Sequence, residues 1–255
     1  MKLYCILCFA VAGMLFFGCK SDPVQPTSKN GSISGYVQLY DADGNSLISS
    51  AGVNVSISSS DFNAQTDDSG KWIISDLPPG VYSLNFTKAG FGKMEIIGYQ
   101  FVGNGSAFAS NVQMSRPSNE IINFQDFSVA LNMDSSRSYD LVAAMPPPYT
   151  EIRSVLLCIG TDSATLASDP SSALFVSSYA KGGSGYDGSF TISGTDIIDR
   201  TKNLLWRGTK LYATLAVAGE GHNGQNLSNY FDPQTNRQVY TSVSPHSQIL
   251  STLMP

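Results

Sequence analysis

The sequence has few of the side chains that usually carry catalysis or bind metals. Among 255 residues there are 2 histidines, 4 cysteines and 2 tryptophans, and only 14 % of the residues are charged. Neither His222 nor His246 lies in a His-Glu-x-x-His or His-x-x-Glu pattern, so the sequence contains no zinc-peptidase motif. We therefore expect no catalytic residue, no metal ligands and no cofactor.

Two segments come near a catalytic pattern without completing it. Residues 182–186 read Gly-Gly-Ser-Gly-Tyr, in which Tyr186 stands where the nucleophile motif Gly-x-Ser-x-Gly requires glycine. Glu220 lies two residues from His222, but glycines surround both residues and predict a loop without the rigidity that a catalytic pair needs. Both segments favour loops, and the chain is expected not to be an enzyme.

A basic cluster is also missing. The chain carries 15 lysines and arginines against 20 aspartates and glutamates, a formal net charge of −5. Because nucleic-acid binding depends on neutralising phosphates, this balance argues against DNA or RNA as a partner.

The N-terminus carries the pattern of an export signal. Lys2 precedes an uncharged run, residues 3–17, which is too short to cross a bilayer comfortably but suits the apolar part of a secretory signal. Gly18-Cys19 ends the run and resembles the lipobox of bacterial lipoproteins, with Phe16 where that motif usually has leucine. The resemblance implies a signal peptide over residues 1–18, lipidation of Cys19 and anchoring in the outer membrane of a Gram-negative bacterium, at the cell surface. An ordinary secreted protein is the alternative.

Residues after the signal divide into a tether and two domains. Residues 19–30 contain two prolines and few apolar side chains, which predicts a flexible tether. Of the four cysteines, only Cys158 would remain unmodified, within the apolar run Val-Leu-Leu-Cys-Ile. No intrachain disulfide is then expected, and Cys158 is interpreted as a small buried side chain in a strand.

Residues 31–115 show strand and turn signals in a regular order. The first run predicts a half-buried strand, because Ile33, Gly35, Val37 and Leu39 alternate with Ser34, Tyr36 and Gln38. The order of Gly35-Tyr36-Val37, a Thr-Asp-x-x-Gly-x-Trp segment and Leu-Pro-Pro-Gly-x-Tyr resembles the carboxypeptidase regulatory-like domain. That resemblance implies a transthyretin-like β-sandwich with an accessory, non-catalytic role. The aromatic side chains of Trp72, Tyr82 and Phe86 are expected in its core.

Residues 120–255 contain further strand-like runs and one predicted helix, residues 196–206. The spacing resembles a fibronectin type III or immunoglobulin-like sandwich. The fold class predicted for the whole chain is therefore all-β, with two β-sandwich domains in tandem after the lipoprotein signal peptide and tether.

Binding is the remaining class of function. Residues 223–232 are predicted to form a polar loop rich in aromatics, and flat rings beside amides and carboxylates suit a glycan-binding surface. The expected ligand-binding residues are Asn229, Tyr230, Phe231, Asp232 and Trp206. Asp162-Ser163-Ala164 resembles a short O-glycosylation acceptor, which implies modification of Ser163.

These features predict a lipid-anchored accessory protein that takes part in glycan capture or cell-surface assembly. Its expected partners are the membrane, through the lipid anchor, and glycans or other surface proteins. A fimbrillin-like subunit or tip adhesin is the alternative. That alternative requires the first strand to be released and exchanged between subunits.

Overall fold

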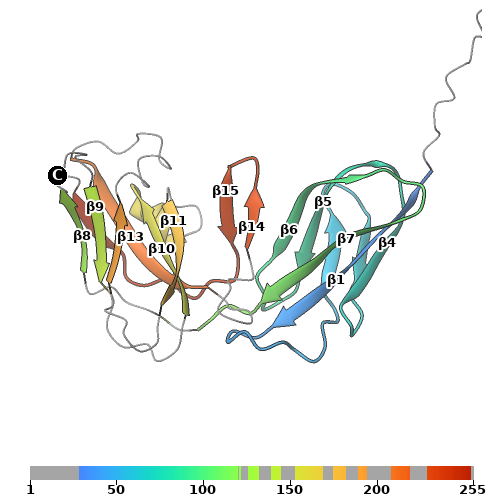
Figure 1. Ribbon diagram of the computed structural model, residues 1–255, viewed down its shortest axis with the longest axis horizontal. Coiled ribbons are helices and arrows are strands. Elements are labelled where there is room, and N and C mark those ends of the chain that lie inside the picture. The colour runs from blue at the N-terminus through green and yellow to red at the C-terminus, as the bar shows by residue number, and fades with distance from the viewer. Residues whose placement is uncertain are drawn as a thin grey trace, which may run out of the picture.

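The chain folds into two β-sandwiches in tandem (Figure 1). The computed structural model describes residues 29–119, 121, 126–131, 139–144, 153–168, 175–181, 189–193, 208–218 and 229–253. Strands β1 to β7 pair with one another, and strands β8 to β16 pair with one another. The all-β prediction is confirmed. Within these ranges, no helix has the length and apolar character needed to cross a bilayer.

The first sandwich consists of two sheets. One sheet has the order β4-β1-β7 and contains β1 (Gly31–Tyr40), β4 (Lys71–Leu77) and β7 (Ser106–Ser115). The other has the order β3-β2-β5-β6 and contains β2 (Asn54–Ile57), β3 (Asn63–Gln65), β5 (Gly80–Thr87) and β6 (Met94–Phe101). β1 is antiparallel to β4 and parallel to β7, so both of its edges are hydrogen-bonded.

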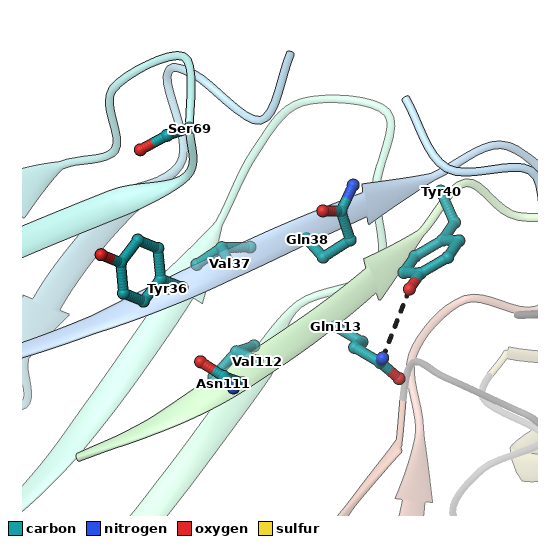
Figure 2. Close-up of a pocket in the computed structure, with 8 residues that line it drawn as sticks. All are labelled: Tyr36, Val37, Gln38, Tyr40, Ser69, Asn111, Val112 and Gln113. Carbon is teal, nitrogen blue, oxygen red and sulfur yellow. Dashed lines mark hydrogen bonds between the residues drawn. The ribbon is translucent and has the colours of Figure 1, made fainter. Parts of the chain in front are cut away.

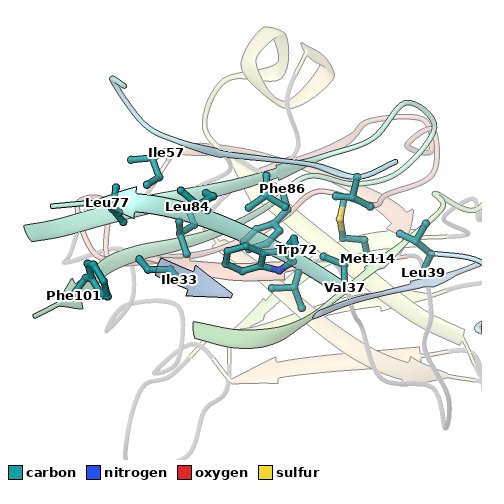
Figure 3. Close-up of a cluster of buried hydrophobic side chains, with 14 residues drawn as sticks. Ile33, Val37, Leu39, Ile57, Trp72, Leu77, Leu84, Phe86, Phe101 and Met114 are labelled. Carbon is teal, nitrogen blue, oxygen red and sulfur yellow. The ribbon is translucent and has the colours of Figure 1, made fainter. Parts of the chain in front are cut away.

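The core of the first sandwich follows the predicted alternation (Figure 3). Ile33, Val37 and Leu39 of β1 are buried between the sheets. Trp72, 1 % exposed, meets Phe86 edge to face with ring centroids 5.7 Å apart, a favourable aromatic geometry. The expectation that these two rings fill the core is confirmed.

The second sandwich also has two sheets. The order β12-β9-β8 joins β8 (Asp126–Leu131), β9 (Tyr139–Ala144) and β12 (Ser189–Ser193). The order β11-β10-β13-β16 joins β10 (Arg153–Gly160), β11 (Phe175–Lys181), β13 (Lys210–Val217) and β16 (Leu250–Leu253). Cys158 of β10 is 1 % exposed, as predicted.

Two elements of the second half, the helix at residues 163–168 and the strand at residues 229–232, differ from the sequence prediction. A short helix, α2 (Ser163–Ser168), was not expected, and its Leu166 packs against Leu156 and Cys158. β14 (Asn229–Asp232) and β15 (Arg237–Tyr240) form an antiparallel hairpin. The prediction of a loop is therefore wrong for residues 229–232, because cross-strand pairing orders them. The predicted helix over residues 196–206 lies outside the described residues.

Gly70 closes the turn between β3 and β4 and provides a test of the first sandwich. Gly70 and Gly90 both have a positive φ, +82° and +78°. A Cβ at Gly70 would lie 1.9 Å from the carbonyl oxygen of Val37, whereas a Cβ at Gly90 meets nothing within 4 Å. Only Gly70 therefore combines backbone strain with a steric clash.

We expect Gly90→Ala to lower the free energy of unfolding by about 1–2 kcal/mol, the cost of a left-handed alanine. Gly70→Ala should cost several kcal/mol, about 4 or more, because β1 must move as well. Urea denaturation of residues 20–255 measures both. Equal losses for the two variants would contradict the close approach of Gly70 to β1.

Candidate functional site: an aromatic and amide face on the first sandwich

The outer surface of the β4-β1-β7 sheet carries a group of uncharged aromatic and amide side chains. Successive residues of a strand point to opposite sides, so burial of Val37 and Leu39 directs Tyr36, Gln38 and Tyr40 outward. We call this surface the aromatic–amide face. It consists of Tyr36, Gln38 and Tyr40 of β1 and Phe108, Asn111 and Gln113 of β7.

A bulge in β7 brings Phe108 and Asn111 onto the same face. Ser34 pairs with Phe108 and Tyr36 with Asn111, so two steps along β1 match three steps along β7. Such an extra residue interrupts the strict alternation of a strand. Without the bulge, residues 108 and 111 would point to opposite sides of the sheet. The bulge therefore turns Asn111 and Gln113 to the side of the sheet on which Phe108 and Tyr36 lie.

Tyr36 and Phe108 form an exposed aromatic pair. Their ring centroids are 6.4 Å apart, with planes inclined by 44°. Tyr36 is 43 % exposed and Phe108 is 57 % exposed, although large apolar side chains are usually buried. Both rings are therefore available to a ligand.

A shallow, open hollow of about 460 Å³ lies next to this pair (Figure 2). Tyr36, Gln38, Tyr40, Asn111 and Gln113 line it, together with Val37, Ser69 and Val112. The Gln113 side-chain amide donates a hydrogen bond to the Tyr40 hydroxyl at 3.3 Å. None of the lining side chains is charged, so the hollow offers ring faces and neutral hydrogen-bonding groups.

The predicted ligand-binding residues at positions 229–232 lie on the β14–β15 hairpin, and three of them have structural contacts. Tyr230 is half-buried, and the ammonium group of Lys93 lies 5.9 Å from the centre of its ring. Burial raises the pKa of the Tyr230 hydroxyl, and the negative charge of Glu95 adds to this. Asn229 accepts a hydrogen bond from the side chain of Gln238 across the hairpin. Tyr230 thus contacts the first sandwich, and Asn229 links the two strands of the hairpin.

Asp232 and Phe231 complete the predicted set within the described residues. The Asp232 carboxylate accepts hydrogen bonds from the Thr235 hydroxyl and the Gln234 N–H, both at 2.8 Å. The Thr235 hydrogen bond holds the pKa of Asp232 below its usual value. Phe231 is 53 % exposed. Trp206 and Cys19 lie outside the described residues.

Ser163 begins helix α2 and is half-buried. The preceding Asp162 caps the helix, accepting hydrogen bonds from the Thr165 hydroxyl and from the Thr165 N–H at 2.8 Å. The hydroxyl contact contributes most to the lowered pKa of Asp162. Asp162 therefore has a structural role that is independent of any modification of Ser163.

The side chains that could hold a metal ion do not converge in the part of the chain that the structure describes. Within it, no three His, Cys, Asp or Glu side chains are close enough to hold a metal ion. The two ring nitrogens of His246 lie 2.9 Å from the carbonyl oxygens of Ser247 and Ala167. The Asp41 carboxylate accepts the N–H groups of Asp43 and Asn45, which makes it part of a turn. His222 lies outside the described residues.

The sequence analysis did not predict the aromatic–amide face, although the alternation in residues 33–39 already indicated which β1 side chains point outward. The alternation that assigned Val37 and Leu39 to the core also assigned Tyr36, Gln38 and Tyr40 to the outside. The contribution of β7 depends on its pairing with β1 and on the bulge, which turns Asn111 and Gln113 to the side that Phe108 occupies. The pairing register is needed to find that contribution.

No protein-family model matches the chain, and no curated protein sequence matches it. Among solved structures, a Bacteroides uniformis protein assigned provisionally as carbohydrate-binding is 11 % identical, with a TM-score of 0.26, covering 88 % of this chain and 100 % of that one. A DUF3823 family protein of Bacteroides ovatus is 12 % identical, with a TM-score of 0.24 and coverages of 89 % and 100 %.

A mutant type II cohesin–X-dockerin complex of Acetivibrio cellulolyticus is 24 % identical, with a TM-score of 0.30. The match covers 34 % of this chain and spans 58 % of the length of that one. At these TM-scores the likenesses say nothing about ligand or partner.

Proposed function

We propose that the protein is a non-catalytic, lipid-anchored surface protein that captures uncharged glycans through the aromatic–amide face. The observation that carries this proposal is the exposed Tyr36–Phe108 pair beside a neutral, amide-lined hollow. The N-terminal signal pattern ending at Cys19 supports export and lipidation. The role is an accessory one, in glycan capture or cell-surface assembly.

The chemistry of the face suits a sugar better than it suits an ionic ligand. A sugar ring presents apolar C–H groups on its flat sides and hydroxyl groups around its rim. Tyr36 and Phe108 can stack on the flat sides, while Gln38, Asn111 and Gln113 can exchange hydrogen bonds with hydroxyls. These side chains carry no charge, and the exposed Lys71 of β4, which pairs with Tyr36, adds one cation beside them.

The proposed glycan site lies on the first sandwich, whereas the sequence predicted it on the second. Tyr230 and Asp232 were expected to contact a ligand, but Tyr230 packs toward Lys93 and Asp232 stabilises the hairpin turn. Phe231 alone among the described members of that set presents a largely exposed ring. A single ring without neighbouring aromatics gives a smaller stacking surface than the Tyr36–Phe108 pair.

We further propose that the two sandwiches are a carboxypeptidase regulatory-like module and a fibronectin type III-like module. The strand order of the second sandwich supports the latter. Its first, second and fifth strands form one sheet, β12-β9-β8, and β10, β11, β13 and β16 form the other. The β14–β15 hairpin is then an insertion between the last two strands of that sandwich.

The fimbrial alternative requires β1 to leave its place for exchange between subunits. β1 is the central strand of its sheet, and Ile33, Val37 and Leu39 fill the core. Its release would break hydrogen bonds on both edges and expose these side chains. No contact of the described residues favours that exchange over glycan capture.

Replacing Tyr36 or Phe108 with Ala should weaken glycan binding by about 1–2 kcal/mol, roughly a five- to thirtyfold loss of affinity. Both side chains are exposed, so the melting temperature should change little. A glycan array of residues 20–255 identifies the ligand, and calorimetry measures its affinity. Phe231→Ala, which removes an equally exposed ring from the second sandwich, is the control.

A loss of affinity in Phe231→Ala, with Tyr36→Ala and Phe108→Ala unchanged, would return the site to the hairpin. An array without any bound glycan would count against glycan capture and favour an assembly role.

Cys19→Ser should release the protein from the membrane fraction or leave an uncleaved precursor. Acyl chains bind a bilayer with about 0.8 kcal/mol per buried CH₂ group, so losing the lipidated cysteine removes the anchor. Fractionation followed by mass spectrometry of the N-terminus measures this. Native protein found without lipid in the soluble fraction would contradict the proposed anchor.

A further inference from the structure

The β14–β15 hairpin extends from the second sandwich toward the first (Figure 1). It is inserted between β13 and β16, and β14 lies against β6. In its own sheet β6 is an edge strand, with β5 as its hydrogen-bonded neighbour. Exposed edge strands tend to pair with other chains, and cover from another element prevents this.

Two residues that follow the hairpin bind the backbone of the first sandwich. The Thr241 hydroxyl donates a hydrogen bond to the carbonyl oxygen of Lys93. The Ser242 hydroxyl donates one to the carbonyl oxygen of Ser115 at 2.9 Å. Ser242 and Ser115 are both buried, so the hydrogen bond between them is shielded from water, and its polar groups are costly to leave unpaired.

Gly92 allows the two sandwiches to approach closely. A Cβ at this position would lie 2.7 Å from the Ser242 nitrogen and 2.8 Å from the Ser242 Cβ. The Gly92 N–H also donates to the Ser115 carbonyl oxygen at 3.1 Å. The segment that enters β6 therefore contacts Ser242 without an intervening side chain.

Tyr230 adds a side-chain contact on β14. The Lys93 ammonium group lies 5.9 Å from the centre of the Tyr230 ring and forms an ion pair with Glu95 at 3.0 Å. The hydrogen bond to Glu95 raises the pKa of Lys93, so the amine stays protonated. Phe231, the next residue, points away from this contact and is exposed.

We infer that the hairpin, together with Thr241 and Ser242, is a docking element that couples the two sandwiches into one cooperative body. Its partner surface on the first sandwich consists of Gly92, Lys93, Glu95 and Ser115. This surface belongs to β6, the segment before β6, and the end of β7, whereas the aromatic–amide face lies on the outer side of the β4-β1-β7 sheet. Docking therefore fixes the orientation of the face and leaves it open, and it does not depend on the identity of the ligand.

Gly92→Ala tests the coupling in residues 20–255, which include both sandwiches, with Gly90→Ala as the matched control. The alanine at 92 would clash with Ser242, whereas the alanine at 90 meets nothing within 4 Å. We expect the unchanged protein to unfold in one calorimetric transition and to give one narrow interdomain distance distribution in small-angle scattering. Gly92→Ala should split the transition in two and broaden the distribution. Gly90→Ala should keep a single transition, at a lower melting temperature.

Tyr230→Ala and Phe231→Ala form a second pair that does not alter the backbone. Tyr230→Ala should broaden the distance distribution, and Phe231→Ala should leave it unchanged. If Gly92→Ala does not fold, the scattering of Tyr230→Ala compared with Phe231→Ala tests the coupling instead. Two separate transitions in the unchanged protein, or unchanged scattering in both Gly92→Ala and Tyr230→Ala, would overturn the coupling. Either result would leave glycan binding by Tyr36 and Phe108 as a separate question.

Discussion

β1 is fixed by β7 along its length and by β4 over residues 31–36, and as an extended strand it points its side chains alternately to the two sides of the sheet. One direction leads into the core, where Ile33, Val37 and Leu39 pack around Trp72. The other leads to the aromatic–amide face through Tyr36, Gln38 and Tyr40. The stability of the first sandwich and the position of its proposed binding face thus depend on the same strand and the same register.

Gly35 and Gly70 show how closely that strand is enclosed. A Cβ at Gly35 would lie 2.8 Å from the Trp72 ring, and one at Gly70 would lie 1.9 Å from the Val37 carbonyl oxygen. The indole ring and the β3–β4 turn therefore use the space that a side chain would need. Because protein interiors are densely packed, a shift of β1 at either point would move the outward residues as well.

The second sandwich uses polar side chains where regular strand pairing stops. The hydroxyl oxygens of Ser244 and Ser247 accept the N–H groups of Val217 and Leu215, each at 2.9 Å. The N–H groups of the same serines donate to the carbonyl oxygens of Val217 and Leu215 at 2.7 Å. These bonds let an irregular segment cover β13 after it has left the docking element. The segment after the hairpin therefore contacts the first sandwich through Thr241 and Ser242. A few residues later it contacts the core strand β13 of the second sandwich.

The sequence by itself determined the local features of this protein. Alternation identified the buried side of β1, turn residues identified Gly70, and the apolar run around Cys158 identified a buried strand. These features depend on neighbours within a few residues. Only the tertiary structure decided that Phe108 stands beside Tyr36, because this requires a pairing between residues more than 70 positions apart. The β7 bulge then decided that Asn111 and Gln113 share the same face. It also decided that residues 229–232 form a docked strand, since the contact between Thr241 and Lys93 joins positions 148 residues apart. Polar composition favoured a loop there, and cross-strand pairing and docking onto β6 outweighed it.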